Sequence, residues 1–382
     1  MKFIADDKIP YLKGILDPYA EVIYKPGGKI GREDVEDADG LIIRTRTKCN
    51  RALLEGSAVK FIATATIGYD HIDRDFCREN NIQWTNAPGC NSSSVQQYIA
   101  SVLGFLTARS EQKLEGKTLG IIGVGNVGSK IEKLARILNM KVLLNDPPRE
   151  RQEGDKNFVS KEQIFQEADI ISLHVPLNKE KDDKTYHLIN SHSLERIHKN
   201  AILINSSRGA VVDNQALKKA LVDKQIAGAV LDVWENEPDF DQDLQSGLIL
   251  GTPHIAGYSR DGKANGTAMS VQAISRFFGL DLNDWYPAQI EKPEHPLINI
   301  DGAGKSPEQT VFEAIEWTYR VSEDDKRLRK DPGTFEQQRG EYPVRREFQA
   351  YTLNAKNIKP EVQNKLKELG FRMCLIFLLN HD

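Results

Sequence analysis

Cysteine is scarce in this sequence, which has only four among 382 residues. They lie far apart, form no C-x-x-C pair and have no histidine at a zinc-binding spacing. The four are Cys49, Cys77, Cys90 and Cys374. We therefore expect no disulfide framework and no metal site, and we interpret the thiols as reduced and mostly structural.

Long apolar runs are also missing. The N-terminus, MKFIADDKIP, has no apolar core of signal-peptide length. The strongest late run, Cys374 to Leu379, is too short to span a bilayer. These absences predict a cytoplasmic protein without a membrane role.

Charge of one sign is not in excess, because 51 lysines and arginines face 55 aspartates and glutamates, giving a net charge of −4. No basic block resembles those that follow a phosphate backbone, so no nucleic-acid partner is expected. Internal repeats and low-complexity tracts are also lacking. A chain of this length exceeds what one core usually holds, which predicts two or three domains.

What stands out is a glycine-rich stretch from Lys117 to Asp146. An apolar β run, Thr118 to Ile122, leads into Gly123, Gly125 and Gly128, spaced G-x-G-x-x-G. Apolar residues then recur at helical spacing: Ile131, Leu134, Ala135 and Leu138. A strand that turns sharply into a helix through such glycines is typical of a site for the pyrophosphate of a dinucleotide.

An acid follows at the expected place. A second apolar run, Lys141 to Leu144, is followed by Asp146, near the spacing at which a carboxylate binds the adenosine ribose hydroxyls. This carboxylate would repel a 2′-phosphate, which favours NAD over NADP. Arg149 weakens that preference, because it could lie near such a phosphate.

The remaining pattern predicts two parallel α/β regions. In the first, strands are expected at 3–5, 21–24, 41–44 and 61–64, with a helix at 11–16. Asn91 is expected to cap a long helix running to Arg109. Six strands of a doubly wound sheet are then expected around Gly120, Val142, Ile170, Ile202, Ala229 and Ile249. A helix from Asn265 to Phe278 would return the chain to the first region.

A third region follows a proline-containing connection. It is predicted as a strand at 297–300, a helix at 308–319, a charged loop, a helix at 361–369 and a strand at 371–378. A unit of this size is marginal alone, so we expect it to form a homodimer. The predicted domains are 1–95 with 255–285 for substrate, 96–254 for NAD, and 286–382 for dimerisation.

Three motifs place polar residues directly after β runs of the nucleotide region. They are ILINSSRGAVVD with Arg208, AVLDVWENEP with Asp232 and Glu237, and ILGTPHIAGY with His254. In a doubly wound sheet, ligands bind at the carboxyl ends of the strands. The motifs are therefore expected to converge beside the nicotinamide.

These residue types suit hydride transfer. A neutral imidazole accepts the hydroxyl proton as hydride leaves the same carbon, so His254 is the expected base. Glu237, bonded to the other ring nitrogen, would stabilise the imidazolium, and Arg208 would bind a carboxylate. Five other histidines are interpreted as structural or solvated: His71, His174, His187, His192 and His198.

Through GVGNVG, NSSRGAVVD, DVWENEP and TPHIAG, residues 1 to about 285 resemble the D-isomer-specific 2-hydroxyacid dehydrogenase family. The resemblance implies a Rossmann NAD domain, a flavodoxin-like discontinuous substrate domain and, here, a small C-terminal α+β dimerisation domain. It assigns catalysis to Arg208, Glu237 and His254, and substrate contacts to Thr45, Thr66 and Tyr258. Besides the three glycines, it assigns NAD contacts to Asn126, Val127, Asp146, Val175, Ser206, Ser207, Arg208, Asp232 and Gly257.

Three positions depart from the family pattern. Thr45 stands where serine is common and keeps the hydroxyl. Val175 stands where threonine is common, so it would serve through its backbone alone. Gln97 stands where an acid is frequent.

Further motifs point to one branch of the family: ATATIGYDHID, APGCN, NDPPR, HIAGYSRDGKANGT and RREF. The implied substrate is 4-phospho-D-erythronate, an intermediate of vitamin B6 biosynthesis with a carboxylate and a phosphate at opposite ends. Arg44 and Arg346 are the cations expected to contact it. Arg345 and Arg346 are further expected to reach the partner's cleft in a dimer.

Two alternatives remain open. One is a dehydrogenase of the same family acting on phosphoglycerate or glycerate. The other is a non-catalytic NAD-sensing protein, since a fold does not settle function.

Overall fold

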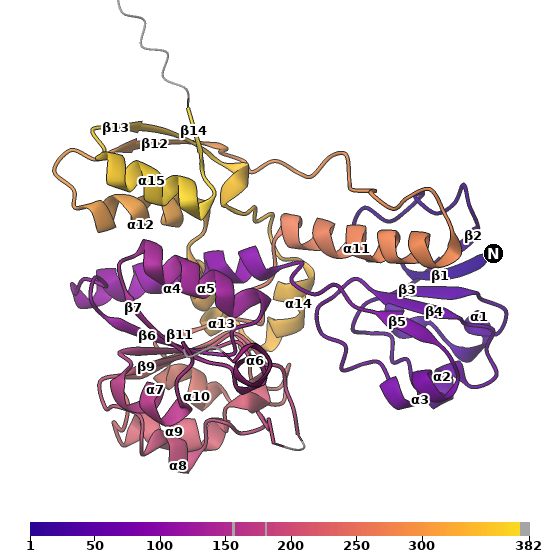
Figure 1. The fold of residues 1–382 in the computed structure, drawn as a ribbon, viewed down its shortest axis with the longest axis horizontal. Helices are drawn as coiled ribbons and strands as arrows, with labels where there is room; N and C mark the ends of the chain where they lie inside the picture. The colour runs from indigo at the N-terminus through magenta and orange to yellow at the C-terminus, as the bar shows by residue number, and fades with distance from the viewer. Residues whose placement is uncertain (155–156, 180–181, 375–382) are drawn as a thin grey trace, which may run out of the picture. The chain divides into compact units, whose positions relative to one another are not determined.

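The computed structural model describes residues 1–154, 157–179 and 182–374 (Figure 1). The chain divides into two compact units, each discontinuous in sequence. The first unit comprises Met1–Ser92 and Ser259–Glu291, and the second comprises Ser93–Tyr258 and Lys292–Asp382.

The first unit is built on a parallel sheet with the strand order β2-β1-β3-β4-β5. Its strands are β1 (Lys2–Asp6), β2 (Glu21–Lys25), β3 (Gly40–Ile43), β4 (Phe61–Thr64) and β5 (Gln83–Thr85). This order is the flavodoxin-like one, as predicted. Its helices are α1 (Arg32–Val35), α2 (Arg51–Leu54), α3 (Arg74–Glu79) and α11 (Arg260–Phe278).

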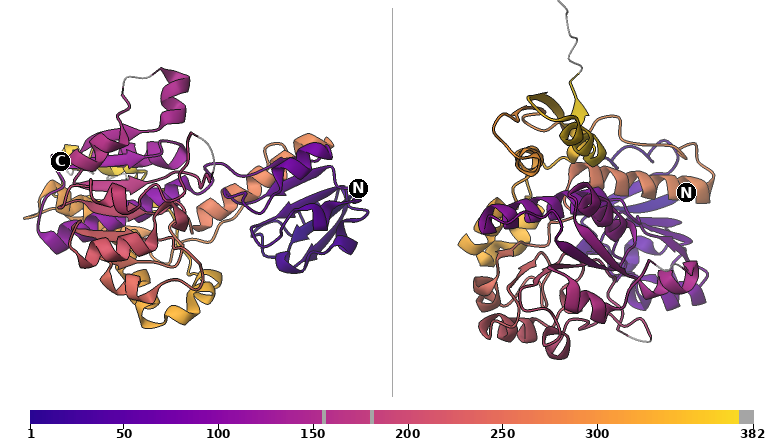
Figure 2. Two further views of the ribbon diagram at one scale, coloured as in Figure 1. Left: turned by 90° about the horizontal axis from the view of Figure 1, so that it is seen from below. Right: turned by 60° about the vertical axis from the view of Figure 1, so that its left-hand side comes forward.

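Helix α11 lies along one face of this sheet and α2 and α3 along the other (Figures 1 and 2). Alternate side chains of the strands supply the two cores. Phe3 and Ile42 pack with Val271 of α11, whereas Ile4 and Leu41 pack on the other face. The predicted helix near Phe278 is thus confirmed, and it begins earlier, at Arg260.

One expectation for the first unit was wrong, and one strand was not predicted. The segment 11–16 forms turns rather than a helix, because Tyr11 and Gly14 take positive φ angles of 65° and 85° that a right-handed helix cannot include. Strand β5 was missed because its sequence, QWT, is short and begins with an exposed glutamine.

The second unit contains the nucleotide sheet, whose described strands are parallel and ordered β11-β10-β9-β8-β6-β7. They are β6 (Thr118–Ile122), β7 (Lys141–Asn145), β8 (Ile170–Leu173), β9 (Ile202–Asn205), β10 (Gly228–Leu231) and β11 (Leu250–Gly251). The predicted six-stranded doubly wound sheet is confirmed. The chain passes from β6 to β7 and then returns to the far side of β6 at β8, so a ligand crevice is expected at the carboxyl ends of β6 and β8.

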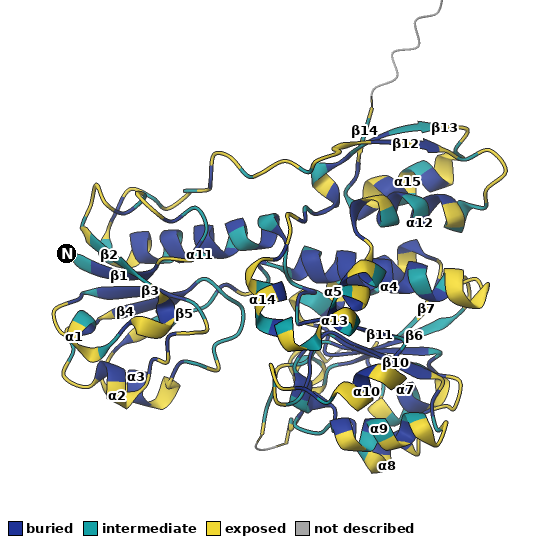
Figure 3. Cartoon of the chain, turned by 180° about the vertical axis from the view of Figure 1, so that it is seen from behind, coloured by how far each residue is buried: buried dark blue, intermediate teal, exposed yellow. Residues whose placement is uncertain are grey.

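Helices cover both faces of this sheet, and its inner strands β6, β8 and β10 are buried along most of their length (Figure 3). Ile121 packs with the core on the side of α4 (Ser92–Ser110) and α5 (Asn126–Ile137). Ile122 packs with the opposite core. The helices that follow are α6 (Pro147–Glu153), α7 (Lys161–Glu167), α8 (Ser191–Leu194), α9 (Asn214–Val222) and α10 (Gln242–Gly247).

Helix α4 runs where it was predicted, but the predicted cap is not formed by the Asn91 side chain. Its oxygen is buried and makes no hydrogen bond to any described residue. The helix begins at the next residue, Ser92.

The C-terminal part of the second unit carries a small parallel sheet, ordered β12-β13-β14. Its strands are β12 (Leu297–Asp301), β13 (Thr352–Lys356) and β14 (Arg372–Met373). Helices α12 (Pro307–Thr318) and α15 (Pro360–Leu369) lie between this sheet and α4 and α5 (Figure 1). The fit is tight, because a Cβ on Gly104 of α4 would lie 2.8 Å from the Phe312 ring.

The expectation of a charged loop after α12 was wrong. This segment instead forms α13 (Val321–Lys330), α14 (Phe335–Gly340) and β13. In α13 the sequence VSEDDKRLRK is almost entirely polar. Its two apolar residues, Val321 and Leu328, lie seven positions apart and are both buried. The strand expected at 371–378 is confirmed at Arg372–Met373, and residues beyond Cys374 lie outside the described part.

Short 3-10 turns complete the order of elements: η1 (Gly27–Lys29), η2 (Gly209–Val211), η3 (Pro332–Thr334) and η4 (Phe348–Ala350). Across the described ranges, no helix combines the length and the apolar character that crossing a membrane requires.

Candidate active site

The glycine turn between β6 and α5 has the three properties that a bound pyrophosphate needs. Gly123 has a φ of 90°, and a Cβ there would lie 2.6 Å from the carbonyl oxygen of His174. A Cβ on Gly128 would lie 2.0 Å from the carbonyl oxygen of Gly123, so the helix packs directly on the turn. A Cβ on Gly125 would meet no atom within 4 Å, which leaves the backbone open to a ligand.

The start of α5 is equally accessible. Gly125 is its N-cap and supplies no side-chain hydrogen bond, and Gly125 and Asn126 are exposed. Val127 is half-buried. Open backbone amides at a helix N-terminus suit an anion, so the residues present fit the dinucleotide.

Asp146 stands at the end of β7, where a ribose-binding acid is expected. One carboxylate oxygen accepts a hydrogen bond from the Val124 amide at 2.7 Å, and the other accepts from the Arg149 amide at 3.1 Å. A carboxylate has about four lone-pair sites, so it keeps capacity for ribose hydroxyls. Arg149 pairs with Glu153 at 2.7 Å and 2.9 Å, so its charge is already neutralised.

We expect Asp146→Asn to narrow the preference for NAD over NADP by roughly 10- to 100-fold, since a hydrogen bond to a charged group is worth about 1.5–3 kcal/mol. The measurement is kcat/KM with each cofactor. Glu150→Gln, an exposed acid on α6, is the matched control and should leave the ratio unchanged. A wild-type preference for NADP would refute the assignment.

The loop after β9 is organised by Asn205. Its side-chain oxygen accepts from the Ser207 amide at 3.0 Å and hydroxyl at 2.8 Å, and its amide donates to the Arg208 carbonyl at 3.0 Å. A Cβ on Gly209 would lie 1.9 Å from the Trp234 carbonyl oxygen. The loop that carries Arg208 therefore packs against the loop that leads to Glu237.

Glu237 and His254 form a hydrogen-bonded pair. Nδ1 of His254 lies 2.7 Å from Oε2 of Glu237, whose Oε1 accepts from the Trp234 amide at 2.8 Å. Burial by itself would raise the pKa of Glu237, but the charge of His254 and these hydrogen bonds outweigh it, so the pKa lies below its ordinary value. The acid is thus held ionised beside the imidazole.

Asp232 anchors the loop that carries His254. Its carboxylate accepts from the Thr252 hydroxyl at 2.7 Å and from the amides of Ile255 and Ala256 at 2.8 Å each. Burial raises its pKa although these three bonds oppose the shift. His254 itself takes a left-handed φ of 55°, with its amide donating to the Asp232 carbonyl at 2.7 Å.

The other residues predicted to contact NAD lie on the same sheet edge. Val175 follows β8, and its side chain covers the glycine turn, 2.8 Å from where a Cβ on Gly123 would be. The hydroxyl of Ser206 is buried and has no hydrogen-bond partner among the described residues. Gly257 follows the anchored loop and is half-buried.

Three predicted substrate residues belong to the first unit. Arg44 makes a bidentate ion pair with the buried Asp6, at 3.0 Å and 3.1 Å. Thr66 donates to the Gly68 carbonyl at 3.0 Å. Thr45 is exposed.

Two further predicted substrate residues belong to the second unit. Tyr258 packs edge-on against the Tyr342 ring, with centroids 5.8 Å apart. Arg346 is half-buried, and its carbonyl accepts from the Gln97 amide at 2.9 Å. The expectation that Arg345 reaches a partner's cleft was wrong, because the residue is only 4% exposed and its side chain donates to carbonyl groups of its own chain.

Four of the five histidines interpreted above as structural or solvated have polar partners in their own unit. His187 lies 2.8 Å from Glu235, His174 lies 2.8 Å from the Ser172 hydroxyl, and His71 lies 3.1 Å from Thr64. Nδ1 of His198 accepts from the Asn200 amide at 3.4 Å. Burial lowers the pKa of His174 to about 3, which keeps it neutral.

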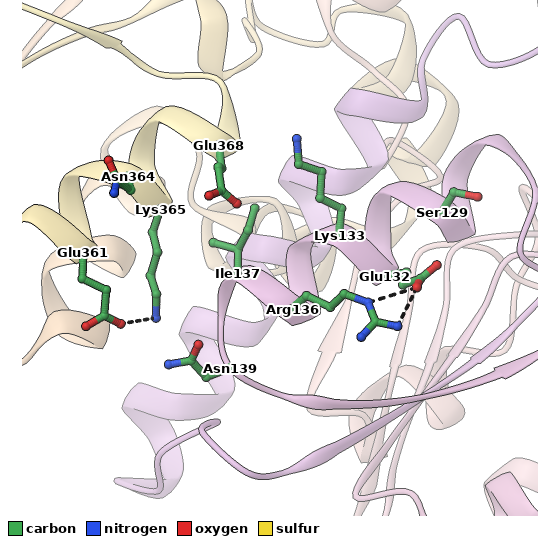
Figure 4. Close-up of a pocket in the computed structure, with 10 residues that line it drawn as sticks. All are labelled: Ser129, Glu132, Lys133, Arg136, Ile137, Asn139, Glu361, Asn364, Lys365 and Glu368. Carbon is green, nitrogen blue, oxygen red and sulfur yellow. Dashed lines mark hydrogen bonds and ion pairs between the residues drawn. The ribbon is translucent and has the colours of Figure 1, made fainter. Parts of the chain in front are cut away.

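A separate hollow of about 630 Å³ lies between α5 and α15 (Figure 4). Charged residues that line this hollow form two ion pairs, Arg136 with Glu132 at 2.8 Å and Lys365 with Glu361 at 3.0 Å. It contains none of the predicted site residues, so we do not count it as part of the candidate active site.

The supporting roles of several residues were not predicted. Asn205 had a local signal, because an asparagine often bonds the backbone two residues later. Asp325, whose carboxylate accepts from the Gly251 amide, and Arg345, which donates to Ala256, had none, because their partners lie 74 and 89 residues away in sequence.

Comparison with known proteins decides the family. Residues 99–256 match the D-isomer specific 2-hydroxyacid dehydrogenase NAD binding domain, and residues 292–370 match a domain of unknown function. Erythronate-4-phosphate dehydrogenase from Bacteroides thetaiotaomicron is 51% identical over 92% of this chain and 99% of its own length. The same-named protein of Proteus mirabilis is 38% identical over 97% and 99%. The chain belongs to the erythronate-4-phosphate dehydrogenase family.

Solved structures agree with this family. D-lactate dehydrogenase from Aquifex aeolicus, complexed with NAD and lactic acid, has a TM-score of 0.61 and 26% identity, over 74% of this chain and 97% of its own. The NAD-bound 3-phosphoglycerate dehydrogenase of Entamoeba histolytica has a TM-score of 0.61 and 28% identity, over 73% and 95%. The predicted family, fold class and NAD cofactor are confirmed, and the protein is an NAD-dependent oxidoreductase of the erythronate-4-phosphate dehydrogenase family.

Proposed function

We propose that the protein oxidises 4-phospho-D-erythronate to 3-hydroxy-2-oxo-4-phosphooxybutanoate in vitamin B6 biosynthesis. The observation that carries the proposal is the 2.7 Å bond between His254 and Glu237 on the sheet that bears the glycine turn. The names of the relatives in Bacteroides and Proteus support the substrate.

The side chains of this protein supply the acceptor for the substrate hydroxyl proton. Nδ1 of a neutral His254 donates to Glu237, which leaves the Nε2 lone pair to accept the substrate hydroxyl proton. Nicotinamide, when bound, supplies the hydride acceptor. As the C2 hydrogen leaves with its electron pair, the carbon–oxygen bond becomes a carbonyl and the imidazolium is stabilised by the adjacent carboxylate.

The remaining roles follow the chemistry of the side chains. Arg208 binds the substrate carboxylate and the developing carbonyl through its planar fork. Arg44 and Arg346 bind the anionic ends of the substrate, and Thr45, Thr66 and Tyr258 also contact it. NAD is held by the glycine turn, by Asp146 and by the loop residues assigned to it above.

A screen of 2-hydroxy acids tests the function. Cofactor reduction is followed with 4-phospho-D-erythronate, D-erythronate, 3-phosphoglycerate and glycerate. We expect the first compound to have the highest kcat/KM. Preference for 3-phosphoglycerate or glycerate would favour another dehydrogenase, whereas NAD binding without any oxidation would favour a sensor.

The pH profile tests the role of Glu237. In the oxidative direction the active form has neutral His254, so kcat/KM should rise with pH and then level off. In Glu237→Gln this rising limb of the pH profile should move to lower pH, because the negative charge that stabilises the imidazolium is gone. The amide oxygen of the substituted side chain would still accept the Nδ1 hydrogen, which preserves the ring orientation.

Glu235→Gln is the matched control. Glu235 lies in the same motif but pairs with a different histidine, His187, at 2.8 Å. Its substitution should leave the limb in place. If the limb does not move in Glu237→Gln either, Glu237 is not the partner of the base.

We also propose a cytoplasmic homodimer, with 1–95 and 255–285 as the substrate domain, 96–254 as the NAD domain and 286–382 as the dimerisation domain. Support for association comes from the small sheet. Leu297, Asn299 and Asp301 of β12 are exposed, and these alternate residues share one face. Sedimentation of the full chain tests the dimer.

A further inference from the structure

The loop that presents His254 is held at both ends by residues from the C-terminal part of the second unit. Before His254, the Gly251 amide donates to Oδ1 of Asp325 at 2.7 Å. After it, the Ala256 carbonyl accepts from Nη2 of Arg345 at 2.6 Å. Both bonds are buried. With the bonds of Asp232 they fix the backbone on each side of the left-handed histidine.

Burying the charged side chain of Arg345 beside this loop is energetically costly. The residue is 4% exposed, and its guanidinium stacks 4.5 Å from the centroid of the Tyr319 ring. Its Nε and Nη1 atoms have no hydrogen-bond partner among the described residues. A buried cation contributes little net stability compared with an apolar side chain of similar size, so stability alone does not explain why an arginine is here.

The surroundings fix where the guanidinium points. The hydroxyls of Tyr319 and Tyr342 both donate to Oδ2 of Asp324, at 2.8 Å and 2.6 Å. These two rings flank Arg345, with the Tyr342 centroid at 5.9 Å. The cation is therefore aimed at the Ala256 carbonyl by aromatic rings whose own orientation is locked.

Asp325 is oriented in a comparable way. Nε of Arg329 lies 2.9 Å from both of its oxygens. The other guanidinium nitrogens of Arg329 donate to the carbonyls of Gln245 and Leu248 at 3.0 Å each. Helix α13 is thus fastened to the segment that enters β11, with the acceptor for Gly251 at its centre.

We propose that Arg345 and Asp325 are positioning residues that hold His254 for proton transfer within their own chain. The region matched only to a domain of unknown function then contributes to catalysis in cis, whatever its role in association. The inference rests on the proposed function, because it assumes that His254 is the base.

The test is Arg345→Met, which keeps the length and the apolar packing but removes the donor. We expect kcat to fall by about 10²-fold, as for a misplacement of about 1 Å at a reacting group, with the Kd of NAD unchanged. The pH limb should shift to lower values, because His254 is held less firmly against Glu237. Hydrogen exchange in the 251–258 segment should also become faster.

Arg327→Met is the matched control. Arg327 lies at the same 5.9 Å from the Tyr342 ring and bonds Asp324 at 2.8 Å, but no hydrogen bond joins its side chain to the described residues of the 251–258 loop. It should leave kcat, the limb and the exchange of that segment unchanged. Arg345→Lys, which keeps the buried charge on an unforked stem, serves if Arg345→Met does not fold, and it should show the same changes at smaller size.

The outcomes separate the two proposals. If the folded Arg345 variants keep the wild-type kcat, pH limb and loop exchange, the positioning role is excluded while the proposed function stands. If the wild type oxidises none of the 2-hydroxy acids, the proposed function fails, and loop exchange still reports whether Arg345 anchors the segment.

Discussion

His254→Asn should lower turnover by roughly 10²- to 10⁴-fold, the usual contribution of a general base. The fold and the affinity for NAD should stay the same, since only the proton acceptor is removed. Asparagine is the appropriate replacement, because His254 has a φ of 55° and asparagine tolerates the left-handed region. The measurements are kcat under saturating substrate and the Kd of NAD by titration.

The control for this prediction is His295→Asn. The side chain of His295 is 71% exposed, so its substitution makes the same chemical change away from the nucleotide sheet. Its kcat should match the wild type. Near-normal turnover of His254→Asn would mean that another group takes the proton.

Gly128→Ala should destabilise the nucleotide domain by about 1–3 kcal/mol or more, the typical cost of overpacking. The added Cβ would lie 2.0 Å from the Gly123 carbonyl oxygen, a backbone atom that cannot move without opening the turn. NAD binding should be lost together with stability. Thermal unfolding and cofactor titration measure the two effects.

Gly125→Ala gives the complementary result. Gly125 has a φ of −77°, and a Cβ there would meet no protein atom within 4 Å. Its Tm should therefore equal that of the wild type, while its affinity for NAD falls because the methyl group enters the space of the pyrophosphate. An equal loss of Tm in both variants would contradict the separate roles of the two glycines.

Features encoded by local patterns were predictable from the sequence. The strands of the nucleotide sheet are short apolar runs such as TLGII and GAVL, and buried parallel strands require such runs. The glycine turn was predictable because its spacing, strand and helix are adjacent in sequence. The pairing of Glu237 with His254 followed from two motifs that end neighbouring strands.

Features that depend on distant partners were not predictable. Tyr11 is an ordinary helix-compatible residue, and its identity does not indicate the positive φ that keeps the expected helix from forming. The sequence from Val321 to Lys330 is charged, and its burial against β11 depends on Asp325 meeting a backbone amide 74 residues away. From the sequence alone, Arg345 would likewise be interpreted as a surface cation, because its partner, the Ala256 carbonyl, is distant in sequence.

The central claim is tested most directly with 4-phospho-D-erythronate carrying deuterium at C2. We expect deuterium to appear in the reduced nicotinamide, and we expect D-erythronate labelled in the same way to transfer it much more slowly. Reduced cofactor without deuterium, or no reduction with the phosphorylated compound, would contradict the claim.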